Sequence, residues 1–320
     1  MSRGWVVPIL LCLSGCLLSG KGGHPSETRP GWAVEDSAII SAGFHSIQFP
    51  DARTGYAVCG GGSIVKSVDG GSTWKEQASG TLSALRSVFF ISPDTGWAVG
   101  DHGVILKTTD GGVAWRAMRS GIDRILNSVQ FLTPSRGWAA GWNATILGTE
   151  DGGETWTVRY EDSSDFNELY GIHFPSADTG YAAGDSGLVL RSVDGGAHWR
   201  RQATGTKEWF YAVFFATSRV GYVGGTDSTI MKTNDAGETW REIRSQVQGI
   251  LSIYFLNPDT GWVAGDFGGL FKTEDGGATW VRQMGAKQTL FSLSFQGPDT
   301  GWAAGDYGII LKTVTGGSSR

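Results

Sequence analysis

The stretch SVDGGSTW, residues 67–74, recurs along the chain and decides which fold the sequence predicts. A fixed period of about 40 residues is typical of repeat architectures, in which each repeat is one small structural unit. The spacings between the aspartates of successive copies are 41, 41, 43, 41 and 40 residues. A seventh copy, TVTGGSSR (313–320), has Thr315 at the aspartate position. The five further complete copies are TTDGGVAW (108–115), TEDGGETW (149–156), SVDGGAHW (192–199), TNDAGETW (233–240) and TEDGGATW (273–280).

Each repeat has the pattern of four short strands. In one repeat these are LRSVFF (85–90), WAVG (97–100), VILKT (104–108) and the residues from Trp115 onwards. Turns rich in Pro, Asp and Gly separate them, and every apolar run is too short for a helix. Repeats of this length with four strands each predict an all-β fold, a seven-bladed β-propeller of four-stranded blades.

The two ends of the repeat array complement each other. The seventh copy lacks the tryptophan and the fourth strand, whereas Gly31-Trp32 stands just before the first repeat. We therefore expect the segment after Trp32 to pair near residues 308–313 and complete the last blade. Such closure removes two exposed sheet edges. It predicts one propeller domain over residues 31–320.

The N-terminal residues resemble a bacterial lipoprotein signal. A positive start and a short apolar run precede Leu13-Ser14-Gly15-Cys16, which matches the lipobox pattern at all four positions. The resemblance implies a signal peptide over residues 1–15, lipid attachment at Cys16 and a flexible tether over residues 16–30. It places the protein in the bacterial cell envelope, in the outer membrane or facing the periplasm if the host is Gram-negative. A plain secretory signal is the alternative.

Composition excludes several classes of function. The net charge of −5 gives no support for a nucleic-acid partner. Cys59 is the one thiol expected in the folded domain, so no disulfide can form within it. The octapeptide lacks the acidic spacing of a calcium loop, and we expect neither a metal nor a cofactor.

The octapeptide resembles the Asp-box, also called the bacterial neuraminidase repeat. In proteins with this motif the aspartate accepts backbone hydrogen bonds within the turn between the third and fourth strands, and the tryptophan packs over the hairpin. Asp, Gly and Thr suit such a turn chemically. The resemblance implies a structural role for the aspartates, which are Asp69, Asp110, Asp151, Asp194, Asp235 and Asp275.

One register position varies where the framework positions repeat. It lies four residues before the phenylalanine that ends each first strand, on the propeller face opposite the octapeptides. Its mixture of aromatic, basic and polar residues is typical of binding surfaces. Arg124 and Lys207, in loops at the same face, are further candidates for partner binding, and Asp101, Asp185, Asp266 and Asp306 lie in its turns. The residues at the variable position are His45, Arg86, Asn127, Tyr170, Tyr211, Leu251 and Phe291.

The full repeat resembles the photosystem II stability and assembly factor propellers. The resemblance implies a non-catalytic scaffold that binds a membrane or envelope protein client. In photosynthetic members, an insertion between repeats helps to form an arginine-rich patch. The regular spacing here leaves no room for such an insertion, so the resemblance does not establish a photosystem as the client.

Two other functions are compatible with the propeller. A carbohydrate-binding role is open, because Tyr170, Tyr211, Trp209 and Phe291 could stack on sugars. A sialidase-like glycoside hydrolase is disfavoured because an arginine triad and an R-I-P stretch are missing, and we expect no catalytic residues.

Overall fold

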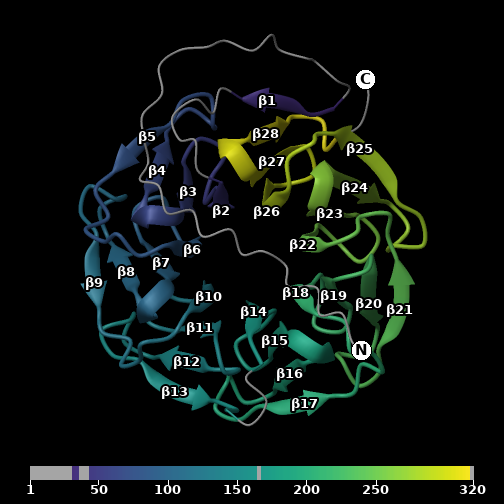
Figure 1. The fold of residues 1–320 in the computed structure, drawn as a ribbon, viewed down its shortest axis with the longest axis horizontal. Coiled ribbons are helices and arrows are strands. Elements are labelled where there is room, and N and C mark those ends of the chain that lie inside the picture. The colour runs from purple at the N-terminus through teal and green to yellow at the C-terminus, as the bar shows by residue number, and fades with distance from the viewer. Residues whose placement is uncertain (1–30, 36–42, 164–166, 318–320) are drawn as a thin grey trace, which may run out of the picture.

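The computed structural model describes residues 31–35, 43–163 and 167–317. These residues form seven four-stranded antiparallel sheets arranged around a central axis (Figure 1). The predicted seven-bladed propeller is confirmed. The predicted signal peptide, Cys16 and the tether lie outside the described residues. Within the described part of the chain, no helix has the length and apolar character needed to cross a membrane.

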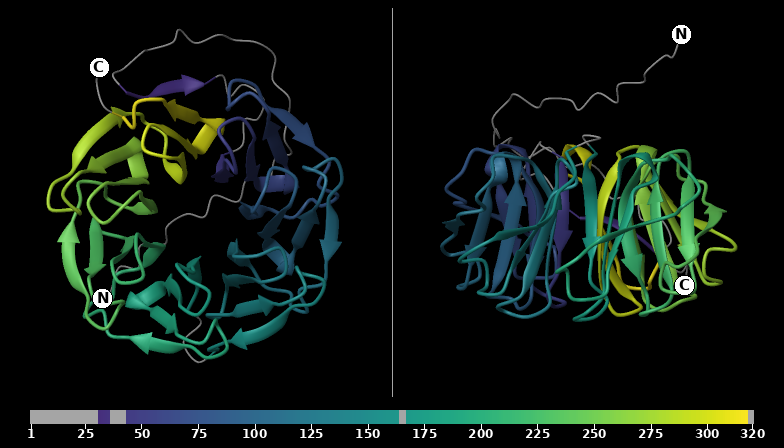
Figure 2. Two further views of the ribbon diagram at one scale, coloured as in Figure 1. Left: turned by 180° about the vertical axis from the view of Figure 1, so that it is seen from behind. Right: turned by 90° about the horizontal axis from the view of Figure 1, so that it is seen from below.

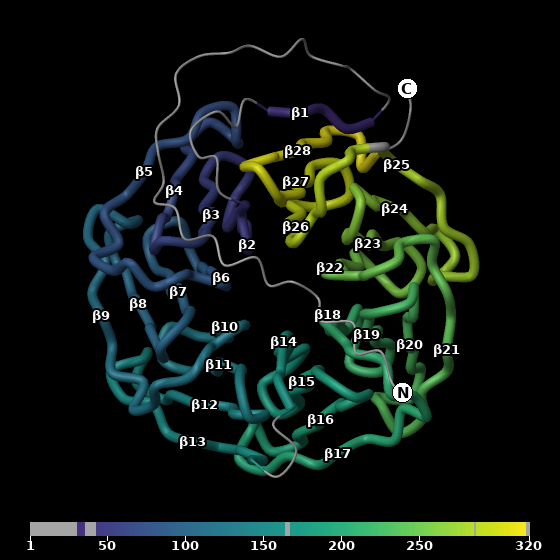
Figure 3. Tube along the Cα trace, viewed as in Figure 1, coloured from purple at the N-terminus to yellow at the C-terminus, as the bar shows by residue number. Residues whose placement is uncertain are grey.

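The strands of each blade follow one another from the axis outwards, and we call them A to D (Figures 1 and 3). The blades, in the order A to D, are β2 (Phe44–Gln48), β3 (Gly55–Cys59), β4 (Ile64–Ser67), β5 (Lys75–Gln77); β6 (Leu85–Phe90), β7 (Gly96–Gly100), β8 (Ile105–Thr108), β9 (Arg116–Met118); β10 (Leu126–Phe131), β11 (Gly137–Gly141), β12 (Ile146–Thr149), β13 (Thr157–Tyr160); β14 (Leu169–His173), β15 (Gly180–Gly184), β16 (Val189–Ser192), β17 (Arg200–Gln202); β18 (Phe210–Phe215), β19 (Gly221–Gly225), β20 (Thr229–Thr233), β21 (Arg241–Arg244); β22 (Ile250–Phe255), β23 (Gly261–Gly265), β24 (Gly269–Thr273), β25 (Val281–Gly285); and β26 (Leu290–Gln296), β27 (Thr300–Gly305), β28 (Ile310–Thr313), β1 (Ala33–Glu35).

Short 3₁₀ turns connect strands B and C in five blades. The turns B–C and the connections D–A lie at one end of the blades, and the turns A–B and C–D lie at the other (Figure 2). We call the first end the entrance face and the second the box face. The 3₁₀ turns are η1 (Gly60–Gly62), η2 (Asp101–Gly103), η3 (Asp185–Gly187), η4 (Asp266–Gly268) and η5 (Asp306–Gly308).

The ring closes as predicted. Strand β1 pairs antiparallel with β28, with Ala33 opposite Lys312 and Glu35 opposite Ile310 (Figure 3). Trp32 is 1% exposed and packs edge-on against Phe295. The start of the described chain therefore supplies the fourth strand and the box tryptophan of the seventh blade.

The phenylalanine at the end of each strand A joins two blades. Phe131 lies parallel to Trp97 of the preceding blade with ring centroids 3.5 Å apart, and perpendicular to Trp156 of its own blade at 5.8 Å. The same arrangement recurs at every blade boundary, including Phe49 against Trp302 across the closure. A Cβ atom on Gly137 would lie 2.5 Å from the Phe131 ring, so only glycine lets the ring pack against this backbone. The other stacked pairs are Tyr56–Phe90, Trp138–Phe174, Tyr181–Phe215, Tyr222–Phe255 and Trp262–Phe295.

The octapeptide is a hydrogen-bonded joint. In the third blade, Asp151 accepts hydrogen bonds from the backbone N–H (3.0 Å) and hydroxyl (2.6 Å) of Thr155 and from the hydroxyl of Thr149 (2.8 Å). These donors hold the pKa of Asp151 well below its usual range. The indole of Trp97, in the preceding blade, donates to the Gly152 carbonyl at 3.0 Å. The joint therefore ties its own hairpin and the neighbouring blade together.

In the fourth blade, His198 replaces the threonine of the joint. Its backbone N–H and its Nδ1 contact the two carboxylate oxygens of Asp194 at 2.9 and 2.7 Å, so the imidazole takes the place of the threonine hydroxyl.

We predict that Phe131→Ala lowers the free energy of unfolding by about 3–5 kcal/mol, because it removes a buried ring packed between two blades. Urea denaturation followed by tryptophan fluorescence measures the change. Val113→Ala is the control, since Val113 is 84% exposed and should contribute almost nothing. A cost for Phe131→Ala below about 1 kcal/mol would contradict the role we assign to this ring.

Candidate functional site

The loops of the entrance face are fixed by backbone hydrogen bonds. In the second blade, Asp101 N donates to the Ala84 carbonyl at 2.9 Å, and Gly103 N donates to the Arg124 carbonyl at 2.6 Å. Each such turn is thus bonded to two D–A connections, the one that leads into its own blade and the one that leaves it. Equivalent bonds run from Asp185 to Glu168 and from Gly187 to Glu208. The candidate side chains are therefore presented on a rigid support.

The variable register position lies on the innermost strands, around the central axis (Figure 1). All seven of its residues are partly buried. Six of them are the side chains that the sequence nominated for partner binding, and the seventh is Leu251. The position therefore forms one ring at the entrance of the channel, which we call the entrance ring.

One half of the entrance ring is basic and aromatic. Arg86 Nε lies 2.5 Å from Asp101 Oδ1, with both side chains about a quarter exposed. His45 Nδ1 lies 2.8 Å from the Leu85 carbonyl, and its ring packs edge-on against Phe291 at 6.3 Å. Burial lowers the pKa of His45, so the imidazole stays neutral at neutral pH.

In the other half of the entrance ring, the amide of Asn127 and two phenols lie near the carboxylate of Glu168, which is not itself a ring residue. Asn127 Nδ2 donates to Glu168 Oε1 at 2.7 Å and to the Leu169 carbonyl at 2.9 Å. Tyr170 and Tyr211 pack edge to face with centroids 5.1 Å apart. Burial, assisted by the charges of Asp266 and Asp185, raises the pKa of Tyr211 to about 12.

Sequence reasoning missed Glu168. Its side chain is 9% exposed, and burial raises its pKa above the usual range. The sequence did contain a signal that could have identified it. Glu168 directly precedes the first residue of a strand A, and no other repeat has an acidic residue at that position.

The turn aspartates differ from one another in their surroundings. Burial raises the pKa of Asp185, Asp266 and Asp306, and the charge of Asp306 adds to the effect on Asp266. Among the residues that the structure describes, no ion pair involves Asp266 or Asp306, whereas Asp101 pairs with Arg86. In the sixth and seventh blades, the turn carboxylates of the entrance face thus have, within the described chain, no cationic partner of the kind that Arg86 provides in the second blade.

The structure places Arg124 and Lys207 in D–A connections and not on strand A, so neither belongs to the entrance ring. Arg124 Nη1 contacts Glu161 Oε2 at 2.8 Å and the hydroxyl of Thr145 at 3.1 Å, and Lys207 is exposed on the connection between the fourth and fifth blades. The eight nominated side chains thus divide into six on the ring and two outside it.

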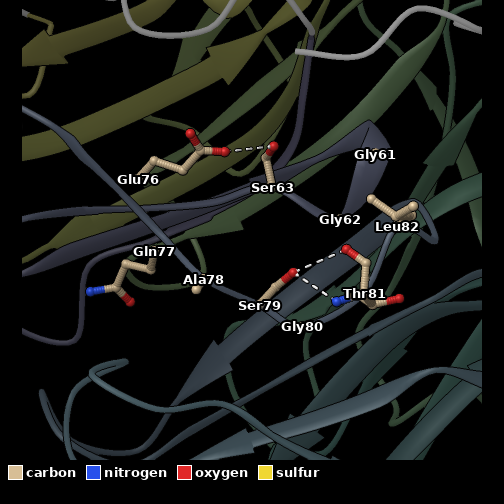
Figure 4. A pocket seen from close by; sticks show the side chains of 10 residues that line it. All are labelled: Gly61, Gly62, Ser63, Glu76, Gln77, Ala78, Ser79, Gly80, Thr81 and Leu82. Atoms are coloured by element: carbon tan, nitrogen blue, oxygen red, sulfur yellow. Dashed lines mark hydrogen bonds between the residues drawn. The ribbon is translucent and has the colours of Figure 1, made fainter.

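A hollow of about 620 Å³ lies beside the first blade, at the outer rim (Figure 4). It is present where Gly60–Gly62 replaces the aspartate-containing turn of other blades, and Leu82 borders it. Its carboxylate, Glu76, accepts a hydrogen bond from Ser63 at 3.1 Å. Glu76 supplies the one carboxylate among the residues that line this hollow, so no pair of carboxylates meets there. Across the described part of the chain, no group of three or more His, Cys, Asp or Glu residues could hold a metal ion.

A family model and several solved structures are similar to this chain. The model described as photosynthesis system II assembly factor YCF48 matches residues 24–109, 108–208 and 242–320, which is most of the sequence. A search of curated proteins finds no match.

The similar structures share the propeller fold. The structure titled "YCF48 bound to D1 peptide" has a TM-score of 0.75 and 22% identity, with 91% of this chain and 99% of that chain covered. YCF48 from Cyanidioschyzon merolae has a TM-score of 0.73 and 22% identity, with 88% and 98% covered. The WD40 propeller domain of Doa1 has a TM-score of 0.71 and 12% identity, with 89% and 97% covered. At these identities the structures establish the fold alone.

We predict that Asp266→Asn stabilises the protein at pH 7. A carboxyl whose pKa is raised in the folded state binds its proton more tightly there than in the unfolded chain, so its ionisation destabilises the fold as pH rises. The gain should shrink as pH falls below the ordinary carboxyl range. Thermal unfolding at pH 3 and pH 7 measures it.

Asp101→Asn is the control for this prediction, because it removes the partner of Arg86 and should give no gain. A lower melting temperature of Asp266→Asn at pH 7 would contradict the assignment.

Proposed function

We propose that this chain, which belongs to the photosynthesis system II assembly factor YCF48 family, is a non-catalytic, lipid-anchored scaffold that binds a protein client through its entrance face. The proposal depends on one observation. The framework positions repeat from blade to blade, whereas the entrance ring holds six different residue types at one register position. A position that the fold does not constrain, on a rigid support, is where specificity for a partner can reside.

The client we propose is a membrane or envelope protein. A relative's structure is titled as a complex with a D1 peptide, which supports recognition of a peptide segment by a propeller of this kind. For this chain we leave the photosystem open as a client, since the repeat spacings stay between 40 and 43 residues.

The lipid attachment that we propose at Cys16 agrees with this choice of client. Residues 17–30 are 14 residues, and a chain of that length reaches at most about 50 Å when extended. The tether would therefore keep the propeller close to a membrane surface in the cell envelope, where membrane clients are found. Carbohydrate binding is the competing function, because the tyrosines of the ring suit sugars as well as protein side chains.

We predict that Arg86→Asn combined with Tyr211→Leu reduces client capture by at least tenfold while the melting temperature changes little. Asn and Leu occupy the same register position in other blades of this chain, as Asn127 and Leu251, so the fold should accept them. In-cell crosslinking of the tagged protein, followed by mass spectrometry, measures capture. Val113→Ser, an exposed change on the box face, is the control.

Enrichment of one envelope protein that the double variant loses would support the scaffold role. Equal capture by the double variant would overturn the assignment of the entrance ring. If no protein is enriched, and a glycan array shows binding that the variant loses, the carbohydrate function replaces the proposal.

We predict that Cys16→Ser releases the protein from the membrane fraction, because the substitution removes the thiol to which the lipid would attach. Fractionation by ultracentrifugation and immunoblotting measures the change. Cys12→Ser is the matched control, since Cys12 follows Leu11 and lies outside the lipobox. Retention of Cys16→Ser in the membrane even in the Arg86→Asn/Tyr211→Leu background would contradict lipid anchoring.

A further inference from the structure

The sixth and seventh blades each present an exposed aromatic ring on the entrance face. Phe267 is 69% exposed and Tyr307 is 78% exposed. Both occupy the middle position of the 3₁₀ turn between strands B and C, in η4 and η5. Neighbouring blades thus carry the same feature at the same place, and both rings are open to solvent.

The fold does not require aromatic residues at this position. The equivalent residue is Gly61 in the first blade, His102 in the second and Ser186 in the fourth. All five have a left-handed backbone, with φ between 53° and 68°, a conformation that bulky side chains rarely adopt. Phe267 and Tyr307 therefore occupy an unfavourable conformation without gaining burial, so packing within the monomer does not explain them.

Each aromatic residue directly follows an aspartate that forms no ion pair among the described residues. Asp266 and Asp306 open the same two turns. Burial raises the pKa of both, and the charge of Asp306 adds to the effect on Asp266, whereas a hydrogen bond from Thr289 and the nearby His45 act on the pKa of Asp306 in the opposite direction.

In the second blade, the equivalent aspartate, Asp101, forms an ion pair with Arg86, which occupies the variable position of strand A. In the sixth and seventh blades that position holds Leu251 and Phe291, which supply no cation. Among the described residues, Lys287 on the adjoining connection forms no ion pair with either carboxylate.

We propose that these two turns, Asp266-Phe267 and Asp306-Tyr307, bind a basic, extended segment of the protein partner through its lysine or arginine side chains. This inference rests on the proposed function and adds the chemistry of the partner. An aromatic face and a carboxylate together are complementary to a cation, since the ring attracts it and the acid neutralises it. Two copies of this pair on adjacent blades suit a ligand with at least two positive charges along a chain. A neutral sugar would stack on the rings and donate hydroxyl hydrogen bonds to the carboxylates, but it would bring no positive charge to neutralise them.

The test is fluorescence anisotropy with the full-length chain and two labelled 12-residue peptides. One peptide alternates lysine with serine, and the other alternates glutamate with serine. We expect the lysine peptide to bind, with affinity falling as salt rises from 50 to 300 mM, and the glutamate peptide not to bind. Equal binding of the two peptides would overturn the proposal.

Two variants locate the binding. Phe267→Ser/Tyr307→Ser introduces the residue that Ser186 already provides in the same conformation, so folding should be preserved, and we expect affinity for the lysine peptide to fall on the order of tenfold. Asp266→Asn/Asp306→Asn should weaken binding and flatten its dependence on salt. Val68→Ser/Val193→Ser removes comparably exposed apolar side chains from the box face and should leave binding unchanged.

Three outcomes would overturn this site. They are full binding by the serine variant, equal loss in the box-face control, and competition by neutral oligosaccharides at the two rings. Capture of a client that the Arg86→Asn/Tyr211→Leu variant loses but Phe267→Ser/Tyr307→Ser retains would refute this site while leaving the scaffold role intact. Peptide binding that depends on the two turns, with no client captured in cells, would support the site and refute the scaffold role.

Discussion

The stacking of one phenylalanine between two blades is the interaction on which the rest of the structure depends. Each of the seven rings lies flat on an aromatic residue of the preceding blade and edge-on to the tryptophan of its own blade. Each such contact adds roughly 0.5–1.5 kcal/mol beyond the burial of apolar area. Since every blade contributes to two of these contacts, no blade forms its full set of interactions until its neighbours are in place. The octapeptide stabilises the same boundary, because a strand B indole or phenol donates to its carbonyl in most blades.

This arrangement separates stability from recognition within each repeat. The box face and the space between blades hold the stacked rings, the glycines and the octapeptide aspartates, which recur with little change. The entrance face holds the residues that differ, such as Arg86, Asn127 and Tyr211. A change at Arg86 or Tyr211 therefore alters charge and shape at the channel while the stacked rings between blades stay in place, whereas His45 and Asn127 also bond to a carbonyl of the next blade. The turns that support this ring are fixed from both sides by backbone hydrogen bonds.

The sequence was sufficient to predict the fold, because the framework is periodic and its turn chemistry is local. The number of blades and the pairing of the first and last strands followed from the spacing of Asp, Gly and aromatic residues. In the second blade the predicted strands 97–100 and 104–108, and the predicted strand start at Trp115, differ by one residue from β7, β8 and β9. The site was only partly predictable. Register located Arg86 on strand A, but its ion pair with Asp101 depends on how a turn fifteen residues later bends towards it. Glu168 and Arg124 lie in the D–A connections, whose residues differ from blade to blade. The burial of Glu168 and the ion pair of Arg124 with Glu161 therefore could not be read from the repeat.

The closure of the ring has a mechanical consequence. Strand β1 is three residues long, and it joins β28 by the pairing of Ala33, Val34 and Glu35 with the last strand. Any pull on the chain preceding Gly31 reaches this seam before it reaches another part of the propeller. The seam resists through Trp32, which is buried and would have to leave its contact with Phe295 before the strand could peel away. The strand that completes the seventh blade is thus also the first part of the described propeller to bear a force applied at Gly31, and its pairing with β28 sets how much of that force the closed ring withstands.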